Sequence, residues 1–104
     1  MGKNKKGYVY IMTNPKKTVL YTGVTSGIAN RVCEHRLKIH PESFTARYNC
    51  VKLVYYQKFN TIEEAILEEK RIKAGPRRQK EALINSINPE WKDLFEHVQH
   101  LGVG

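Results

Sequence analysis

The carboxylate of Glu69 is the first candidate for chemistry, because the sequence places it on the apolar side of a helix. A helix is predicted from Thr61 to Lys73, beginning at the capping box Thr61-Ile-Glu-Glu. Seven residues make nearly two turns, so Glu69 falls on the angle of Ile62 and shares its face. The apolar stripe consists of Ile62, Ala65, Ile66 and Ile72. A carboxylate that points inward needs a cation, which is either the guanidinium of Arg31 or a metal ion such as Mg²⁺.

Arg31 and His35 are four residues apart on a second predicted helix, so their side chains share one face. This face borders a stripe of Ile28, Val32 and Ile39. A guanidinium grips a phosphate with two parallel hydrogen bonds, which makes Arg31 a candidate phosphate ligand. The alternative is a solvent-facing arginine beside a half-buried histidine.

Two tyrosines and a glycine lie on the β-rich runs near the beginning of the chain. If the turn spans residues 14–17, Tyr10 lies directly opposite Tyr21, and Gly23 follows on the same face. The tyrosines are either functional or an ordinary aromatic cross-strand pair. A glycine within a strand marks either close approach by a ligand or by backbone, or a bulge or strand end.

Six basic residues lie within eleven positions at a predicted helix junction. They are Lys70, Arg71, Lys73, Arg77, Arg78 and Lys80. Clusters of this kind contact phosphate backbones without reading sequence, although a solvated basic face explains them equally well.

The elements that must position these residues follow from periodicity and turn signals. Strands are predicted at Gly7–Thr13, Val19–Val24 and Val51–Phe59. Helices are predicted at Ile28–Ile39, Thr61–Lys73 and Arg77–Ile87, with a short last helix within Glu90–Val98. The segment His40–Asn49 is predicted to be a loop. The order predicts an α/β fold with an antiparallel sheet, as a single domain over residues 7–98, with a flexible basic segment at 1–6 and a tail at 99–104.

Composition narrows the class of protein. The chain has 104 residues, and 18 Lys and Arg against 10 Asp and Glu give a net charge of +8, which favours a polyanionic partner. No apolar run is long enough to span a membrane, and no secretory signal is recognised. Cys33 and Cys50 show neither a disulfide framework nor metal-ligand spacing, so we expect reduced thiols in the cytoplasm.

Taken in order, these residues resemble the motifs of the GIY-YIG nuclease family. Tyr8-Val9-Tyr10 and Tyr21-Thr22-Gly23 resemble the paired motif, with Tyr8 at the first glycine position and Thr22 at the middle of the second half. Arg31 followed by His35 matches the helix motif, and Glu69 matches the single metal-binding glutamate. The segment Asn88–Asp93 is similar to that of small stand-alone bacterial members.

The resemblance implies a three-stranded antiparallel sheet flanked by helices and a metal-dependent phosphodiesterase. Glu69 would hold one Mg²⁺ or Mn²⁺ ion, and Arg31 would grip a phosphate oxygen. Tyr10 and Tyr21 would help to deprotonate the attacking water, and His35 would share that task or orient a tyrosine. Lys73 is expected near the phosphate.

The expected substrate is nucleic acid, DNA rather than RNA. Specificity is expected to come from a branched, flapped or damaged substrate or from a protein partner, and the chain is expected to be a monomer or weak dimer. Two rival functions use the same charge: a nucleic-acid-binding module that does not cut, and a basic ribosome-associated protein.

Overall fold

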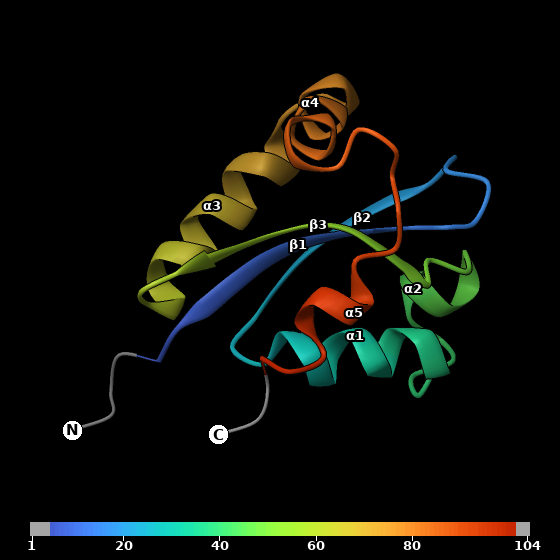
Figure 1. Cartoon of the computed structure of the whole chain (residues 1–104), viewed down its shortest axis with the longest axis horizontal. Helices are drawn as coiled ribbons and strands as arrows, with labels where there is room; N and C mark the ends of the chain where they lie inside the picture. The colour runs from blue at the N-terminus through green and yellow to red at the C-terminus, as the bar shows by residue number, and fades with distance from the viewer. Residues whose placement is uncertain (1–4, 102–104) are drawn as a thin grey trace.

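The computed structural model describes residues 5–101, so the predicted terminal segments lie largely outside the described residues. Strands β1 (Gly7–Thr13), β2 (Leu20–Thr25) and β3 (Lys52–Phe59) form an antiparallel sheet in the order β2-β1-β3. The helices are α1 (Ile28–Leu37), α2 (Phe44–Arg47), α3 (Ile62–Ala74), α4 (Arg77–Ile87) and α5 (Phe95–Val98). Helices α3 and α4 cover one face, and α1 and α5 cover the other (Figure 1). The predicted α/β class and three-stranded antiparallel sheet are confirmed.

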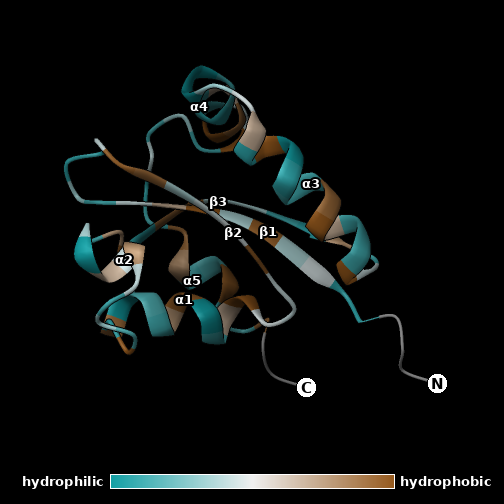
Figure 2. Ribbon diagram, turned by 180° about the vertical axis from the view of Figure 1, so that it is seen from behind, coloured by the Kyte–Doolittle hydropathy of each residue, from teal (hydrophilic) through white to brown (hydrophobic). Residues whose placement is uncertain are grey.

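The central strand β1 is buried along its whole length, because both of its faces are covered. Tyr8, Tyr10 and Met12 point toward α1 and α5, and Val9 and Ile11 point toward α3 and α4. A strand covered on both faces reads as continuously apolar, which is the pattern of Gly7–Thr13. Figure 2 shows apolar residues along the strands and hydrophilic residues over much of α1 and α4.

The register of the first hairpin differs from the prediction. Tyr10 lies opposite Gly23 and Met12 lies opposite Tyr21, so the predicted Tyr10–Tyr21 cross-strand pair is wrong. The loop is longer than four residues, because the Asn14 side chain oxygen accepts from the backbone N–H groups of Thr18 (2.8 Å) and Val19 (2.9 Å). A slip of two residues preserves the face of each side chain, so both tyrosines still lie on the α1 side.

The Asn88–Asp93 segment fastens the end of the chain to β3. Asn88 Nδ2 donates to the Val54 carbonyl at 3.1 Å, and the Leu53 N–H donates to Asp93 Oδ1 at 3.2 Å. The register of β1 against β3 shifts near this point, between Ile11 and Met12. These hydrogen bonds give Asn88 and Asp93 a structural role, because they fasten the segment to β3 where its pairing with β1 is irregular.

Three helix predictions need correction. The predicted loop at His40–Asn49 contains α2, whose first turn is capped by Ser43 Oγ accepting from the Ala46 N–H at 3.2 Å. Ile39 is 53% exposed because α1 ends at Leu37, before a left-handed Lys38. The last helix covers only Phe95–Val98 and leaves Trp91 outside it.

The other helices agree closely with the prediction. Thr61 Oγ1 accepts from the Glu64 N–H at 3.2 Å and begins α3, which ends at Gly75. Helix α4 has the predicted bounds. No helix within residues 5–101 has the length and apolarity needed to cross a bilayer.

Candidate active site

Two tyrosines and a histidine meet on the α1 side of the sheet, next to its β2 edge. Tyr10 Oη and His35 Nε2 share a hydrogen bond of 2.9 Å. The ring centres of Tyr10 and Tyr21 are 6.3 Å apart, and those of Tyr21 and His35 are 5.6 Å apart. On its other side, His35 Nδ1 shares a hydrogen bond of 2.8 Å with Thr45 Oγ1. The histidine is thereby fixed between β1 and α2.

Position 23 must be a glycine because the Tyr10 ring occupies the space of a side chain there. The two residues lie opposite each other, and a Cβ at position 23 would lie 2.4 Å from Tyr10 Oη and 2.5 Å from its Cζ. The ring therefore crosses β2 where the strand has no side chain. The structure shows neither of the two alternatives from sequence, because the close approach at Gly23 is made by the side chain of Tyr10.

Burial fixes the protonation of the pair. Burial raises the pKa of Tyr10 well above its ordinary value, with Tyr21 adding to the rise and the Arg31 guanidinium opposing it. Burial, together with the positive charge of Arg31, lowers the pKa of His35 to about 4. At neutral pH, Tyr10 keeps its proton and His35 is uncharged.

A pocket of about 270 Å³ opens beside this cluster. It is lined by Tyr21, Arg31, Glu34, His35, His40 and Ser43. Arg31 Nε lies 3.1 Å from Glu34 Oε1, and 43% of the arginine side chain is exposed. Tyr10 is fully buried and does not line the pocket, whereas Tyr21 does. A phosphate in the pocket would meet a guanidinium, a phenol and an imidazole.

Glu69 is buried as predicted, with 9% of its surface exposed. Its Oε2 lies 2.8 Å from Lys73 Nζ, one helical turn away. The alternative of an ion pair with Arg31 is therefore wrong, because Glu34 is the carboxylate that Arg31 contacts. Lys73 Nζ also lies 5.9 Å from the centre of the Tyr21 ring, so α3 approaches the cluster around the β2 edge.

The donor set around Glu69 fits a hard cation that keeps most of its water. Within residues 5–101, no three His, Cys, Asp or Glu side chains gather as a metal cluster. Mg²⁺ uses one or two carboxylates and fills its shell with water and phosphate oxygens, so a single glutamate suffices. The Lys73 side chain is 50% exposed and can turn away from Glu69.

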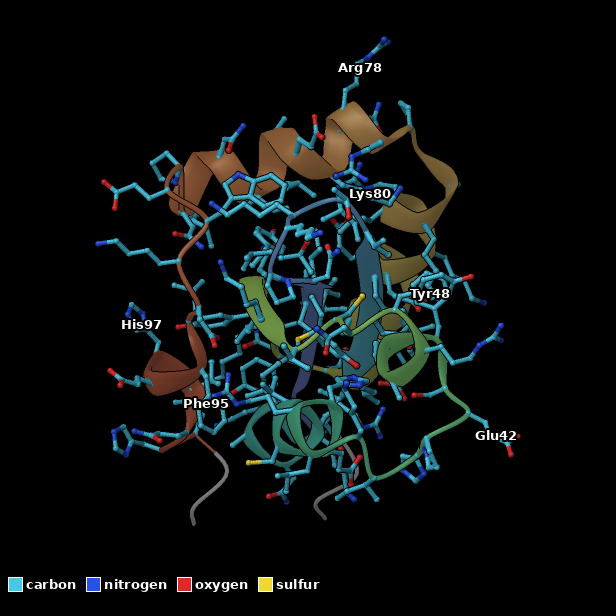
Figure 3. The ribbon with its side chains drawn as sticks, turned by 90° about the vertical axis from the view of Figure 1, so that its right-hand side faces the viewer. Glu42, Tyr48, Arg78, Lys80, Phe95 and His97 are labelled. Carbon is cyan, nitrogen blue, oxygen red and sulfur yellow. The ribbon has the colours of Figure 1, made fainter. Side chains whose placement is uncertain are left out.

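The predicted basic cluster divides into tied and untied side chains. Arg71 pairs with Glu68, and Arg77 pairs with Glu81 at 2.8 Å and donates to the Thr18 carbonyl at 2.8 Å. Lys80 Nζ donates to the Gly75 carbonyl at 2.8 Å. Among the described residues, Lys70 and Arg78 form neither an ion pair nor a hydrogen bond. Figure 3 shows Arg78 pointing away from the body of the protein.

Sequence reasoning missed two residues that hold the candidate site in place. Thr45 is 2% exposed and binds His35, and Glu34 holds the guanidinium of Arg31. Glu34 had a readable signal, since it follows Arg31 by one helical turn. Thr45 had none, because α2 is too short for periodicity to reveal.

Comparisons with known proteins agree with this architecture. The GIY-YIG catalytic domain family matches residues 6–82. A UPF0213 protein of Syntrophus aciditrophicus is 36% identical over 85 residues, covering 82% of this chain and 95% of that protein. A UPF0213 protein of Oceanobacillus iheyensis is 36% identical over 85 residues, covering 78% and 92%. One of Clostridium perfringens is 40% identical over 83 residues, covering 76% and 83%. No solved structure matches the chain significantly. With the family matched over most of its length, the chain belongs to the GIY-YIG family of nucleases.

Proposed function

We propose that this chain is a divalent-metal-dependent endonuclease that hydrolyses phosphodiester bonds in nucleic acid, with DNA as the preferred substrate. One observation carries the proposal. A buried carboxylate, Glu69, is connected through Lys73 to the β2 edge where Tyr21 lines a pocket with Arg31. A buried carboxylate is costly, so its link through Lys73 to the edge that carries the pocket supports a role in binding a cation there.

The pocket residues have separable roles in this proposal. Arg31 exchanges Glu34 for a non-bridging phosphate oxygen and stabilises charge that develops there. Tyr21 is the tyrosine that can contact the attacking water, because it lines the pocket. Tyr10 is buried and is a positioning residue, which holds the imidazole of His35 through its 2.9 Å hydrogen bond. A Mg²⁺ or Mn²⁺ ion at Glu69 would stabilise charge on the scissile phosphate and the leaving oxygen.

The basic residues at the α3–α4 junction give the proposal a binding surface. Lys70 and Arg78 lie on either side of the α3–α4 junction, Lys73 and Arg77 lie between them in sequence, and Lys80 follows on α4. We propose that these residues contact backbone phosphates without reading bases. Selection of the substrate then rests on its structure or on a protein partner, and residues 7–98 form the nuclease domain.

A cleavage panel tests the activity. Single-stranded, duplex, flapped and four-way-junction DNA, together with RNA, are incubated with Mg²⁺, Mn²⁺ or EDTA. We expect metal-dependent cutting that Glu69→Ala abolishes and that Glu64→Ala, a change at an exposed position of the same helix, leaves intact. Cutting by Glu69→Ala at the parental rate removes the glutamate from the mechanism.

Binding without cleavage is the second candidate function. The Glu69–Lys73 ion pair favours it, since a carboxylate satisfied by lysine has less need of a metal. Tight, salt-sensitive binding with no cutting of any substrate in either metal would establish this alternative and refute the nuclease.

A further inference from the structure

Aromatic side chains continue from the pocket onto α2, outside the residues already given catalytic roles. The ring centres of Tyr21 and Phe44 are 5.9 Å apart with planes inclined by 29°, and those of Phe44 and Tyr48 are 4.6 Å apart. The Arg47 guanidinium carbon lies 5.9 Å from the centre of the Tyr48 ring. Phe44, Arg47 and Tyr48 are called the α2 platform below. Phe44 contacts Tyr21, which lines the pocket, so the α2 platform lies next to the pocket.

The platform rings are not part of the core. Phe44 is 44% exposed and Tyr48 is 46% exposed, whereas Tyr8, Tyr10 and Tyr55 are at most 5% exposed. Figure 3 shows Tyr48 beside α2, near the surface of the protein. Rings that served only to hold α2 would gain more by being covered. Their exposed area is therefore available to a ligand that approaches the pocket.

Charge and chemistry indicate what that ligand is. The chain carries a net charge of +8, and the platform itself includes the cation of Arg47 beside an aromatic ring. Aromatic rings next to a basic groove are the arrangement on which bases of single strands stack. In a duplex, each base face is already covered by its neighbours. An unpaired base, in contrast, offers a free face to the ring.

We propose that the α2 platform stacks an unpaired base of the substrate strand, next to the nucleotide whose phosphate enters the pocket. This inference rests on the proposed nuclease function and specifies its substrate class as single-stranded or splayed nucleic acid. The phosphates contribute to the binding affinity through their charge, as those of any polyanion would. The α2 platform adds a contribution to the affinity that depends on the presence of bases. Phe44 and Tyr48 are then specificity-determining residues.

Binding in EDTA separates bases from phosphates without any need for cleavage. The anisotropy of a labelled thymidine oligomer is compared with that of an abasic oligomer of equal length and charge. We expect the unmodified protein to bind the thymidine oligomer about tenfold more tightly, as one base stacked on an aromatic ring provides. Phe44→Ala and Tyr48→Ala should remove this difference and leave the abasic affinity unchanged. That unchanged affinity also shows that the variants are folded.

Two further variants sharpen the test. Tyr48→Trp should keep the preference for bases, because it retains a ring. Leu67→Ala removes another exposed apolar side chain, 69% exposed on α3, and should change neither affinity. Equal binding of the two oligomers by the unmodified protein, or an equal loss of preference in Leu67→Ala, overturns the proposal.

The outcome for the platform is distinguishable from that for the nuclease. Preference for bases without cleavage in Mg²⁺ or Mn²⁺ supports the platform and refutes the enzyme. Metal-dependent cleavage with no preference for bases supports the enzyme and refutes the platform.

Discussion

Replacement of Gly23 by alanine tests whether the Tyr10 ring is held in place by its neighbours. The added Cβ would lie 2.4 Å from Tyr10 Oη and 2.5 Å from Cζ, whereas unstrained carbon contacts are about 3.5–4.0 Å. The ring, fully buried and hydrogen-bonded to His35, must move by about 1 Å. Overpacking of this kind costs about 1–3 kcal/mol, or about 4–8 °C in Tm for each kcal/mol. The displaced phenol releases His35, and misplacement by about 1 Å lowers catalysis about 100-fold.

Two other glycines provide matched controls, with stability followed by urea denaturation and cleavage measured where each variant is folded. A Cβ at Gly27 has no atom within 4 Å, so Gly27→Ala should change both quantities little. A Cβ at Gly7 would meet Ala65 Cβ at 2.7 Å and Ile62 Cα at 2.8 Å, against α3. Gly7→Ala should therefore destabilise the fold and keep cleavage per folded molecule. If Gly23→Ala behaves as Gly27→Ala does, the Tyr10 ring is not constrained as described.

The remaining predictions concern charge. Glu69→Ala should abolish cleavage and preserve binding measured by anisotropy, and Glu64→Ala should preserve both. The pKa of His35 is lowered to about 4 from 6.5, so the unfolded chain binds a proton that the folded chain does not. Stability present at pH 7 should therefore fall as the pH drops from 6.5 toward 4, and urea midpoints should show a weaker fall in His35→Gln than in His97→Gln. Arg78→Gln should lower the salt slope of binding by about one, and an unchanged slope places the binding surface elsewhere.

Much of the fold could be predicted from the sequence, because its signals are local. The capping box at Thr61 and the turn at Gly75 define α3, and the β-rich run of Gly7–Thr13 defines the central strand. The hairpin register was wrong because a side chain sets the loop length. The Asn14 side chain accepts hydrogen bonds from the backbone N–H groups of Thr18 and Val19. Turn-forming residue types alone do not predict these hydrogen bonds or the longer loop that they stabilise.

The error in register did not change which residues were predicted to share the α1 side of the sheet. Side chains alternate along a strand with a period of two, so a slip of two residues left Tyr10, Tyr21 and Gly23 on the predicted face. The error changed only the cross-strand partners. Tyr10 lies opposite Gly23, and its ring occupies the space where a side chain at position 23 would lie. The partner of Glu69 had a local signal, because Lys73 follows it by one helical turn, whereas Arg31 contacts Glu34.

Helix α2, which lies in a segment predicted from the sequence to be a loop, forms the aromatic surface beside the pocket. Helix α2 has four residues, too few for an apolar stripe, and it is held by Ser43 and by tertiary contact with Tyr21. Its Thr45 orients His35, and its Phe44 carries the aromatic surface outward. Under the proposed function, the strands and longer helices position the residues that act on the phosphodiester bond, and the connection after α1 contributes the surface that selects the substrate. Such a division is common, because binding residues lie disproportionately on connecting segments that a rigid scaffold positions. Exchanging the connection at 38–50 between relatives should then transfer substrate preference without transferring the rate of the chemical step.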